Sequence, residues 1–310
     1  MIITVTLNPA IDKTVEVKNF EPGRLNRVKS VRLDAGGKGI NVSKVIKSLG
    51  GISKATGFLG RENSSFIINY LNRHNIENEF VFLSGETRTN LKIFDSSRKV
   101  ITEINEPGPE VEDTDIENFE RVLFKNVQQG DIVVLTGSVP KNAEEDIYGI
   151  WIKKLNKNGV RTILDAEGNL LKEGIKQSPY LIKPNIHELE GLLGYKVSGV
   201  KEIESFAKKL IEDFNIEIAV VSLGNKGAIF VNRSQTVYAH GPQVDIKSTV
   251  GAGDAMVAAL AYSIEKELDF EKAVTLSMAA AAAKTMVEGS KPPSIDIIRT
   301  LEKQITYEIV

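Results

Sequence analysis

The spacing of hydrophobic residues changes along the chain, and the changes predict where strands and helices lie. Residues 2–7 are apolar and β-branched and predict a first strand. Beyond residue 109, short apolar runs alternate with segments whose apolar residues recur every three or four positions. This alternation indicates βαβ units and a mostly parallel sheet covered by helices on both faces. The predicted helices of this part cover residues 113–126, 143–157, 186–193, 200–213, 253–266, 270–287 and about 295–304, and its predicted strands cover 131–135, 160–164, 180–182 and 216–221.

The first third of the chain has a different pattern, in which short strands are half polar. Such strands are typical of antiparallel pairing with one face exposed to water. These half-polar strands are 14–17, 27–33, 80–83, 89–94 and 99–104, the last three forming a predicted meander. We therefore expect one α/β domain over residues 1–310, with a small β-sheet from segments 11–34 and 85–104 placed against it as a lid.

Composition and charge exclude several classes of protein. A hydrophobic content of 42% with 26% charged residues is typical of a globular protein. A net charge of −2 without a dense basic run argues against nucleic acid and membranes as partners. The absence of cysteine excludes disulfides and thiolate metal sites, and three separated histidines argue against a histidine-rich metal site. Since we find neither a signal peptide nor an apolar run near the ~20 residues that span a bilayer, we expect a cytoplasmic protein.

The segment Ser248–Met256 is the first candidate for chemistry. Gly251 and Gly253 precede an apolar helical run and let the backbone approach a ligand, because neither has a Cβ. The free N–H groups and the positive end of the helix dipole favour an anion there. Asp254 places a carboxylate in the same position, which suggests a base beside a transferring phosphoryl group. An ordinary N-cap aspartate explains the residue equally well.

A second glycine cluster, Gly36-Gly37-Lys38-Gly39, also opens a predicted helix. It is not a Walker loop, because Lys38 is followed by glycine rather than by serine or threonine. It can hold an anion or approach a polyol, with Lys38 adding a cation, or it can be a helix-entry turn with a solvated lysine. Two glycine-rich helix starts in one chain favour phosphoryl transfer between two facing sites.

Two further loops follow buried strands, where the ligand crevice of an open α/β sheet lies. Asn185 and Glu188 stand three positions apart at a helix start, which suits water-bridged Mg²⁺ near phosphates. A capping box explains the same spacing, and spacing alone favours it. The loop Ser222–Gly227 fits a turn over a nucleotide or a plain hairpin, and Arg88 in the small sheet fits a forked phosphate contact or a solvated surface arginine.

Taken in order along nearly the whole chain, these motifs resemble the ribokinase-like sugar kinases, in the phosphofructokinase-B branch. The matching segments are Asn8–Asp12, Gly36–Val42, Lys183–Glu188, Ser222–Gly227 and Thr249–Asp254. The resemblance implies a ribokinase-like α/β fold with a β-lid, ATP and Mg²⁺ as cofactors, and a homodimer formed through the lid. It also implies that Asp254 is the catalytic base rather than a cap.

The resemblance assigns the other site residues by their matching positions. The anion hole beside the base consists of Gly251, Ala252 and Gly253. The substrate-binding residues are Asp12, Gly37, Lys38, Asn41, Arg88, Asn90 and Ser138. The nucleotide-binding residues are Lys183, Asn185, Ser222, Gly224, Gly227 and Val250. The residues for Mg²⁺, held through water, are Asn185 and Glu188.

Two positions depart from the family pattern. Asp165 is followed by Ala-Glu-Gly where relatives usually carry Asp-x-Ser-Gly, so Asp165 carries over and its neighbour's role does not. Ser248 stands where ribokinases often have aspartate, which puts a monovalent cation site in doubt.

Lys38 and the tetrad Thr87–Asn90 are similar to those of kinases that act on an already phosphorylated ketohexose. The resemblance therefore implies ATP-dependent phosphorylation of fructose 1-phosphate to fructose 1,6-bisphosphate, with tagatose 6-phosphate as the alternative substrate. A kinase of unphosphorylated sugars and a non-catalytic sugar-sensing protein remain as rival hypotheses.

Overall fold

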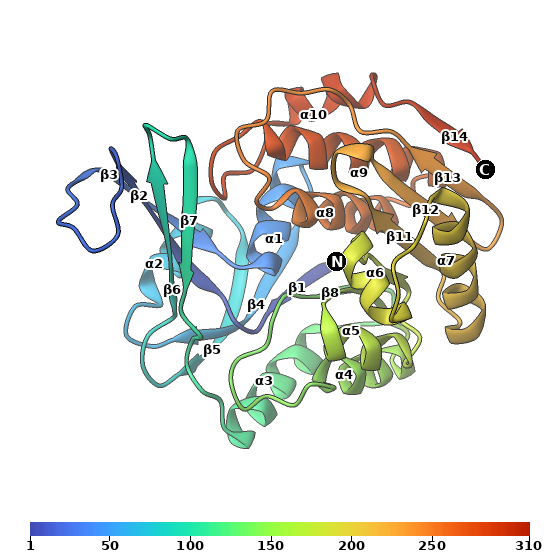
Figure 1. Cartoon of the computed structure of the whole chain (residues 1–310). Coiled ribbons are helices and arrows are strands. Elements are labelled where there is room, and N and C mark those ends of the chain that lie inside the picture. Colours follow the sequence, from blue (N-terminus) through green and yellow to red (C-terminus); the bar gives the residue numbers. More distant parts are fainter.

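The computed structural model describes residues 1–310 and contains a ten-stranded sheet and a separate four-stranded sheet (Figure 1). In spatial order the large sheet consists of β14 (Tyr307–Ile309), β13 (Thr236–Ala239), β12 (Ala228–Asn232), β11 (Ile218–Ser222), β10 (Leu181–Ile182), β9 (Arg161–Asp165), β8 (Ile132–Thr136), β1 (Ile2–Thr6), β4 (Ser53–Gly60) and β5 (Glu77–Leu83). The strands from β11 to β5 pair in parallel, and β12, β13 and β14 add antiparallel pairs at one edge. The mostly parallel α/β architecture expected from the sequence is confirmed.

Helices cover both faces of the large sheet. One face packs against α3 (Asp113–Asn126), α4 (Ile147–Lys157), α5 (Gly168–Ile175), α6 (Ile186–Leu193) and α7 (Val200–Phe214). The other packs against α1 (Lys38–Ser48), α8 (Ala252–Glu265), α9 (Phe270–Thr285) and α10 (Ile295–Glu302). A further helix, α2 (Ser65–Arg73), has its own smaller apolar cluster with β4 and β5. None of these helices combines the length and the apolar character needed to cross a membrane.

The central strands are apolar on both faces because both faces are covered. In β8, Val133 and Leu135 belong to one core and Ile132 and Val134 to the other. This arrangement follows from the alternation of side chains along a strand. It explains why these strands read as continuous apolar runs rather than as alternating ones.

Small residues bring the helices of the second face close to the sheet and to each other. A Cβ on Gly39 in α1 would lie 2.5 Å from Thr6 Oγ1 and 2.7 Å from the carbonyl oxygen of Val5. The facing helices α8 and α9 each bury four alanines, more than any other residue type. The first turns of α1 and α8 can therefore approach the ends of the central strands, where the candidate site lies.

The small sheet has the order β3 (Val28–Gly36), β2 (Ala10–Val17), β6 (Thr89–Asp95), β7 (Val100–Asn105) and stands at one side of the molecule (Figure 1). Its outer pairs are antiparallel, as expected, but the central pair of β2 and β6 is parallel. The expectation of antiparallel pairing was wrong here, because two separate hairpins enter the sheet side by side in the same direction.

The predicted meander over residues 78–104 was also wrong in its first strand. Strand β5 pairs in parallel with β4 and forms the edge of the large sheet. The segment β4-α2-β5 is thus a crossover unit of the main domain. Its polarity reflects an edge strand with one poorly covered face, and an edge strand can have the same half-polar pattern as a hairpin strand.

The fold predicts a strong stability effect at the aromatic cluster beneath β4. Phe119 in α3 is fully buried, with ring centroids 5.3 Å from Phe58 and 5.1 Å from Trp151. We expect Phe119→Ala to lower the free energy of unfolding by about 3–5 kcal/mol, because it removes buried surface and leaves a cavity. Denaturant unfolding followed by the fluorescence of Trp151, the single tryptophan, measures this change.

Phe82→Ala is the matched control, since Phe82 lies partly exposed on β5. We expect it to change the free energy of unfolding by under about 1 kcal/mol. Equal effects of the two substitutions would contradict the placement of Phe119 in the core.

Candidate active site

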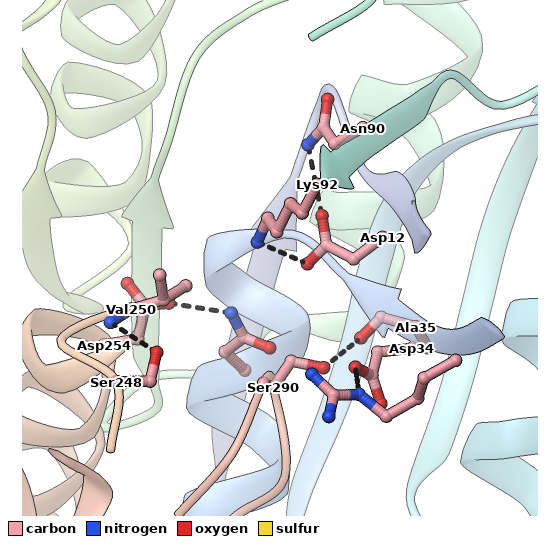
Figure 2. A network of polar contacts seen from close by, with 12 residues as sticks. Asp12, Asp34, Ala35, Asn90, Lys92, Ser248, Val250, Asp254 and Ser290 are labelled. Carbon is pink, nitrogen blue, oxygen red and sulfur yellow. Dashed lines mark hydrogen bonds and ion pairs between the residues drawn. The ribbon is translucent and has the colours of Figure 1, made fainter. Parts of the chain in front are cut away.

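The candidate site lies where α1 and α8 begin, at the carboxyl ends of the central strands. Gly37 is the N-cap of α1 and Gly251 the N-cap of α8. Gly251 has φ +80°, a conformation that favours glycine. The two first turns are joined by a hydrogen bond of 2.8 Å from Asn41 Nδ2 to Asp254 Oδ2 (Figure 2).

Asp254 is not the cap of its helix. The N-cap position is occupied by Gly251, and α8 has no side-chain cap hydrogen bond. The carboxylate of Asp254 is instead buried and held by Asn41. Burial raises the pKa of Asp254, and the negative charge of Asp165 raises it further, while Lys38 and the Asn41 hydrogen bond oppose this shift. The N-cap alternative is therefore excluded, and a carboxylate with a raised pKa is suited to accept a proton.

The turn before α8 supplies N–H groups without full backbone partners. The N–H of Ala252 makes a long bond of 3.4 Å to the carbonyl oxygen of Thr249, and that of Gly253 has no backbone partner. Val250 N–H donates to Ser248 Oγ at 3.3 Å. The positive end of the helix dipole reinforces these donors, so the turn can receive an anion.

Asp165, at the end of β9, organises two lysines beside this turn. Its carboxylate is 2.8 Å from Lys183 Nζ and 3.6 Å from Lys38 Nζ, and it accepts a hydrogen bond of 2.8 Å from Thr136 Oγ1. Burial alone would raise the pKa of Asp165, but Lys183 and Lys38 outweigh it and bring the pKa to about 2. Asp165 in turn raises the pKa of Lys38 to about 12. Two charged ammonium groups thus lie together near the start of α8, since a Cβ on Gly253 would be 3.5 Å from Lys183 Nζ.

A second polar cluster lies on the small sheet. Asn90 Nδ2 donates to Asp12 Oδ1 at 3.3 Å, and Lys92 Nζ lies 3.5 Å from Asp12 Oδ2 (Figure 2). The parallel register pairs Asp12 with Asn90, and alternation puts Lys92 on the same face as Asn90. Sequence reasoning found Asp12 and Asn90 but missed Lys92. The alternation was visible in the sequence, but the neighbouring strand was not known.

Arg88 is held by backbone groups at the base of the small sheet. Its guanidinium donates to the carbonyl oxygens of Asn8 at 3.0 Å, Pro9 at 3.3 Å and Glu106 at 3.2 Å. Burial lowers the pKa of Arg88. The structure thus gives this arginine a local structural role: the charge of Asp12 acts on it, but no hydrogen bond or ion pair joins its guanidinium to another predicted site residue. Ser138 is exposed after β8, next to Gly137, whose added Cβ would lie 3.6 Å from Lys38 Cβ.

The segment Lys183–Glu188 forms a capping box, the alternative that spacing favoured. Asn185 Oδ1 accepts the N–H groups of His187 and Glu188, and Glu188 Oε2 accepts the N–H of Asn185. Burial raises the pKa of Glu188. The second carboxylate oxygen, Glu188 Oε1, makes no protein hydrogen bond, which fits an ion that keeps most of its waters, such as Mg²⁺. Asn185 Oδ1 already accepts two backbone N–H groups and is less free for such a role.

The loop after β11 is a hairpin that lies beside the capping box. Gly224 begins a short 3₁₀ turn, η1 (Gly224–Lys226), and β12 returns antiparallel to β11. Ser222 N–H donates to the carbonyl oxygen of Pro184 at 3.0 Å. Two of the predicted nucleotide-binding segments therefore lie side by side.

Two buried lysines near the site were not singled out from the sequence. Lys44 in α1 donates to the carbonyl oxygens of Ala35 and Ser290, and burial lowers its pKa to about 8. Lys284 at the end of α9 donates to the carbonyl oxygen of Gly289 at 2.6 Å. Both lie in runs of apolar or small residues, so only the closeness of their helices to the site could have revealed them.

Known proteins resemble this chain over nearly its whole length. Residues 5–297 match the model of the pfkB family carbohydrate kinases. The chain is 36% identical over 288 residues to 1-phosphofructokinase of Bacillus subtilis, covering 93% of each chain. It is 37% identical over 281 residues to 1-phosphofructokinase of Escherichia coli K12, covering 91% of this chain and 89% of that one.

The fold is similar to a solved structure of phosphofructokinase-2 from Escherichia coli in complex with substrates and products. The TM-score is 0.93 with 27% identity, and the match covers 98% of each chain. The ribokinase-like fold implied by the motifs is thereby confirmed. With a family model that spans nearly the whole sequence, the chain belongs to the pfkB family of carbohydrate kinases.

Proposed function

We propose that this carbohydrate kinase uses ATP to phosphorylate fructose 1-phosphate to fructose 1,6-bisphosphate. The observation that carries the proposal is the buried Asp254 at the start of α8, held by Asn41 and close to the Lys38–Asp165–Lys183 cluster. A base, an anion-binding turn and two cations are what phosphoryl transfer to an alcohol requires. The choice of fructose 1-phosphate over tagatose 6-phosphate rests on relatives that are named 1-phosphofructokinase.

In the proposed reaction the Asp254 carboxylate accepts the proton of the attacking primary hydroxyl. The hydroxyl oxygen forms a bond to the γ-phosphorus of ATP, and the bond between that phosphorus and the bridging oxygen of ADP breaks. The N–H groups of Ala252 and Gly253 stabilise the negative charge that gathers on the transferring group. Asn41 keeps the carboxylate in one orientation, so the base is positioned before the sugar arrives.

The cations divide into two groups around the base. Lys38 and Lys183 share Asp165 near the start of α8, which supports contact with the phosphoryl group in transfer. Lys92 lies on the small sheet with Asp12 and Asn90, which supports contact with the sugar phosphate. That Lys38 and Arg88 bind the existing sugar phosphate stays a prediction, and the backbone contacts of Arg88 favour a supporting role for it.

ATP is proposed to lie over the hairpin Ser222–Gly227 and the adjoining Val250. Mg²⁺, held through water by Glu188 and Asn185, would neutralise phosphate charge when bound. Glu188 suits this role because its Oε1 makes no protein hydrogen bond and the charges of Lys183, Asp165 and Lys38 lie near enough to shift its pKa. A requirement for a monovalent cation stays in doubt, and the cytoplasmic location stays a prediction.

We further infer that two copies pair through their small sheets. Alternation places Val31 and Leu33 of β3 and Ile104 of β7 on the face opposite to Asp12. Their exposed fractions are 55%, 47% and 54%, which is high for large apolar side chains. Large apolar side chains exposed on both edge strands of one sheet face support burial of that face against another protein surface.

The substrate is tested by a coupled ADP assay with fructose 1-phosphate, fructose 6-phosphate, tagatose 6-phosphate and free fructose. We expect the highest kcat/KM with fructose 1-phosphate, and we expect Asp254→Asn to lower kcat by about 10²–10⁴-fold, because it removes the base. ATP affinity of this variant should stay near that of the wild type. A preference for another acceptor would overturn the assignment of fructose 1-phosphate as substrate, and no turnover with any of the four would favour a sugar sensor. Normal turnover by Asp254→Asn would overturn the assignment of Asp254 as the base.

The Asn41–Asp254 hydrogen bond generates a pH prediction. This bond lowers the pKa of Asp254, so Asn41→Ala should raise that pKa and move the acid limb of the kcat/KM profile to higher pH. The sign follows because the base works only when deprotonated. Asn72→Ala, at an exposed position of α2, is the control and should leave the acid limb in place. An acid limb that moves to lower pH in Asn41→Ala would contradict the assignment.

The dimer is tested by light scattering on the double variant Val31→Glu/Leu33→Glu. We expect the wild type to have the mass of two chains and the variant that of one, because like charges would face each other across the interface. Ile52→Glu changes an apolar residue that is 64% exposed outside the small sheet, and it should leave the mass unchanged. A dimeric double variant would refute pairing through this face.

A further inference from the structure

Lys284, on the last turn of α9, is a buried lysine without an ion-pair partner. Only 1% of its surface is exposed, and its Nζ donates to the carbonyl oxygen of Gly289 at 2.6 Å. A buried ammonium group is costly unless its surroundings compensate it. Methionine or leucine would fill the same space in this alanine-rich core, so packing alone does not account for a lysine.

The side chain of Lys284 runs directly against the turn that begins α8. A Cβ on Gly251 would lie 3.1 Å from Lys284 Cε and 3.7 Å from Asp254 Oδ2. The turn therefore has Lys284 on one side and the catalytic carboxylate on the other. A Cβ here would be tight against Lys284 Cε, and the φ of +80° at Gly251 favours glycine as well.

The backbone after Lys284 supports the same turn from a second direction. The carbonyl oxygen of Thr285 accepts the N–H groups of Lys247 at 2.8 Å and Ser248 at 3.1 Å. Residues 247 and 248 lead into the Val250–Gly253 segment. The end of α9 thus fixes the entry to the anion-binding turn by a backbone contact and by a side chain.

Charged groups on four elements face the Lys284 ammonium. Asp254 of α8 and Asp34 of β3 attract it, while Lys92 of β6, Arg32 of β3 and Lys44 of α1 repel it. Burial is the largest influence and lowers the pKa of Lys284 to about 8. The attraction by Asp254 shows that the ammonium belongs to the same electrostatic group as the base, although no ion pair joins them.

We propose that Lys284 is a positioning residue for phosphoryl transfer, which holds the Gly251–Asp254 turn in place and provides a fixed positive charge behind it. The charge opposes the negative charge that Asp254 and the transferring group bring together. This inference rests on the proposed kinase function. It adds to that function a cation that reaches the site from behind the turn and touches neither substrate.

Two substitutions distinguish the effect of the Lys284 charge from the effect of its side-chain volume. Lys284→Met keeps most of the volume and removes the charge, whereas Lys284→Ala removes both and leaves room for a small cation next to the Gly289 carbonyl. We expect both variants to lose about tenfold to hundredfold in kcat, with KM for ATP and for the sugar phosphate changed by less than about threefold. Added ammonium or methylammonium chloride should restore kcat in Lys284→Ala but not in Lys284→Met, with sodium chloride at equal ionic strength as the salt control.

Lys272→Ala is the matched control on the same helix, because Lys272 is half exposed and pairs with Glu302 at 3.0 Å. It should keep the kcat of the wild type. All variants are assayed with the acceptor that the wild type uses best, so wild-type turnover tests the proposed function separately.

Three outcomes would overturn the proposal. The first is a Lys284→Met variant with the kcat of the wild type, and the second is a lower kcat in both variants that an added cation does not restore in Lys284→Ala. The third is thermal melting that shows both variants to be unfolded. The last outcome would make the ammonium a structural group only.

Discussion

The buried hydrogen bond between Asn41 and Asp254 is the contact on which the site depends. It joins the first turns of α1 and α8 across 213 positions of sequence, at a point where both helices begin with glycine. The contact requires the two helices to lie close to the strand ends, and this in turn requires Gly39 against β1 and Gly251 against Lys284. A side chain at Gly39 would clash with Thr6 and Val5 of β1 and push α1 away from the strand, and one at Gly251 would press on Lys284 in a backbone conformation that favours glycine. The small residues of this region therefore allow the close approach that positions the carboxylate of Asp254.

The pKa values of the carboxyl groups in the site are set by burial and by fixed neighbouring side chains rather than by water. Asp165 is buried yet strongly acidic, because two lysines and a threonine surround it. Asp254 has no such ammonium within ion-pair distance, so burial prevails and its pKa rises. Two aspartates in one site thus have opposite shifts, and the difference comes from the side chains that meet each of them. Such a separation of acid strengths is typical of sites where one carboxylate works as a base and another as a support.

Much of this arrangement could be predicted from the sequence, because its elements are local. The parallel sheet followed from the apolar runs, and the glycine-rich starts of α1 and α8 followed from adjacent residues. The pairing of β2 with β6 could not be predicted, since it joins segments more than seventy positions apart whose patterns fit either direction. For the same reason Lys92, Lys44 and Lys284 escaped notice. Their meaning comes from distant neighbours, whereas Asn185 and Glu188 showed the capping box that their spacing indicated.

The parallel pairing of β2 and β6 has a mechanical consequence for the small sheet. Its two hairpins leave the main domain through separate connections, near Asn8 and Pro9 and near Arg88 and Glu106, and the guanidinium of Arg88 ties these connections together. If one hairpin moves relative to the main domain, the other must therefore move with it, so the small sheet would move as one rigid unit. The distances among Asp12, Asn90 and Lys92 would then stay the same in every position of the small sheet. The proposed sugar-binding surface is therefore assembled in advance, and only its distance from Asp254 would change as the small sheet moves.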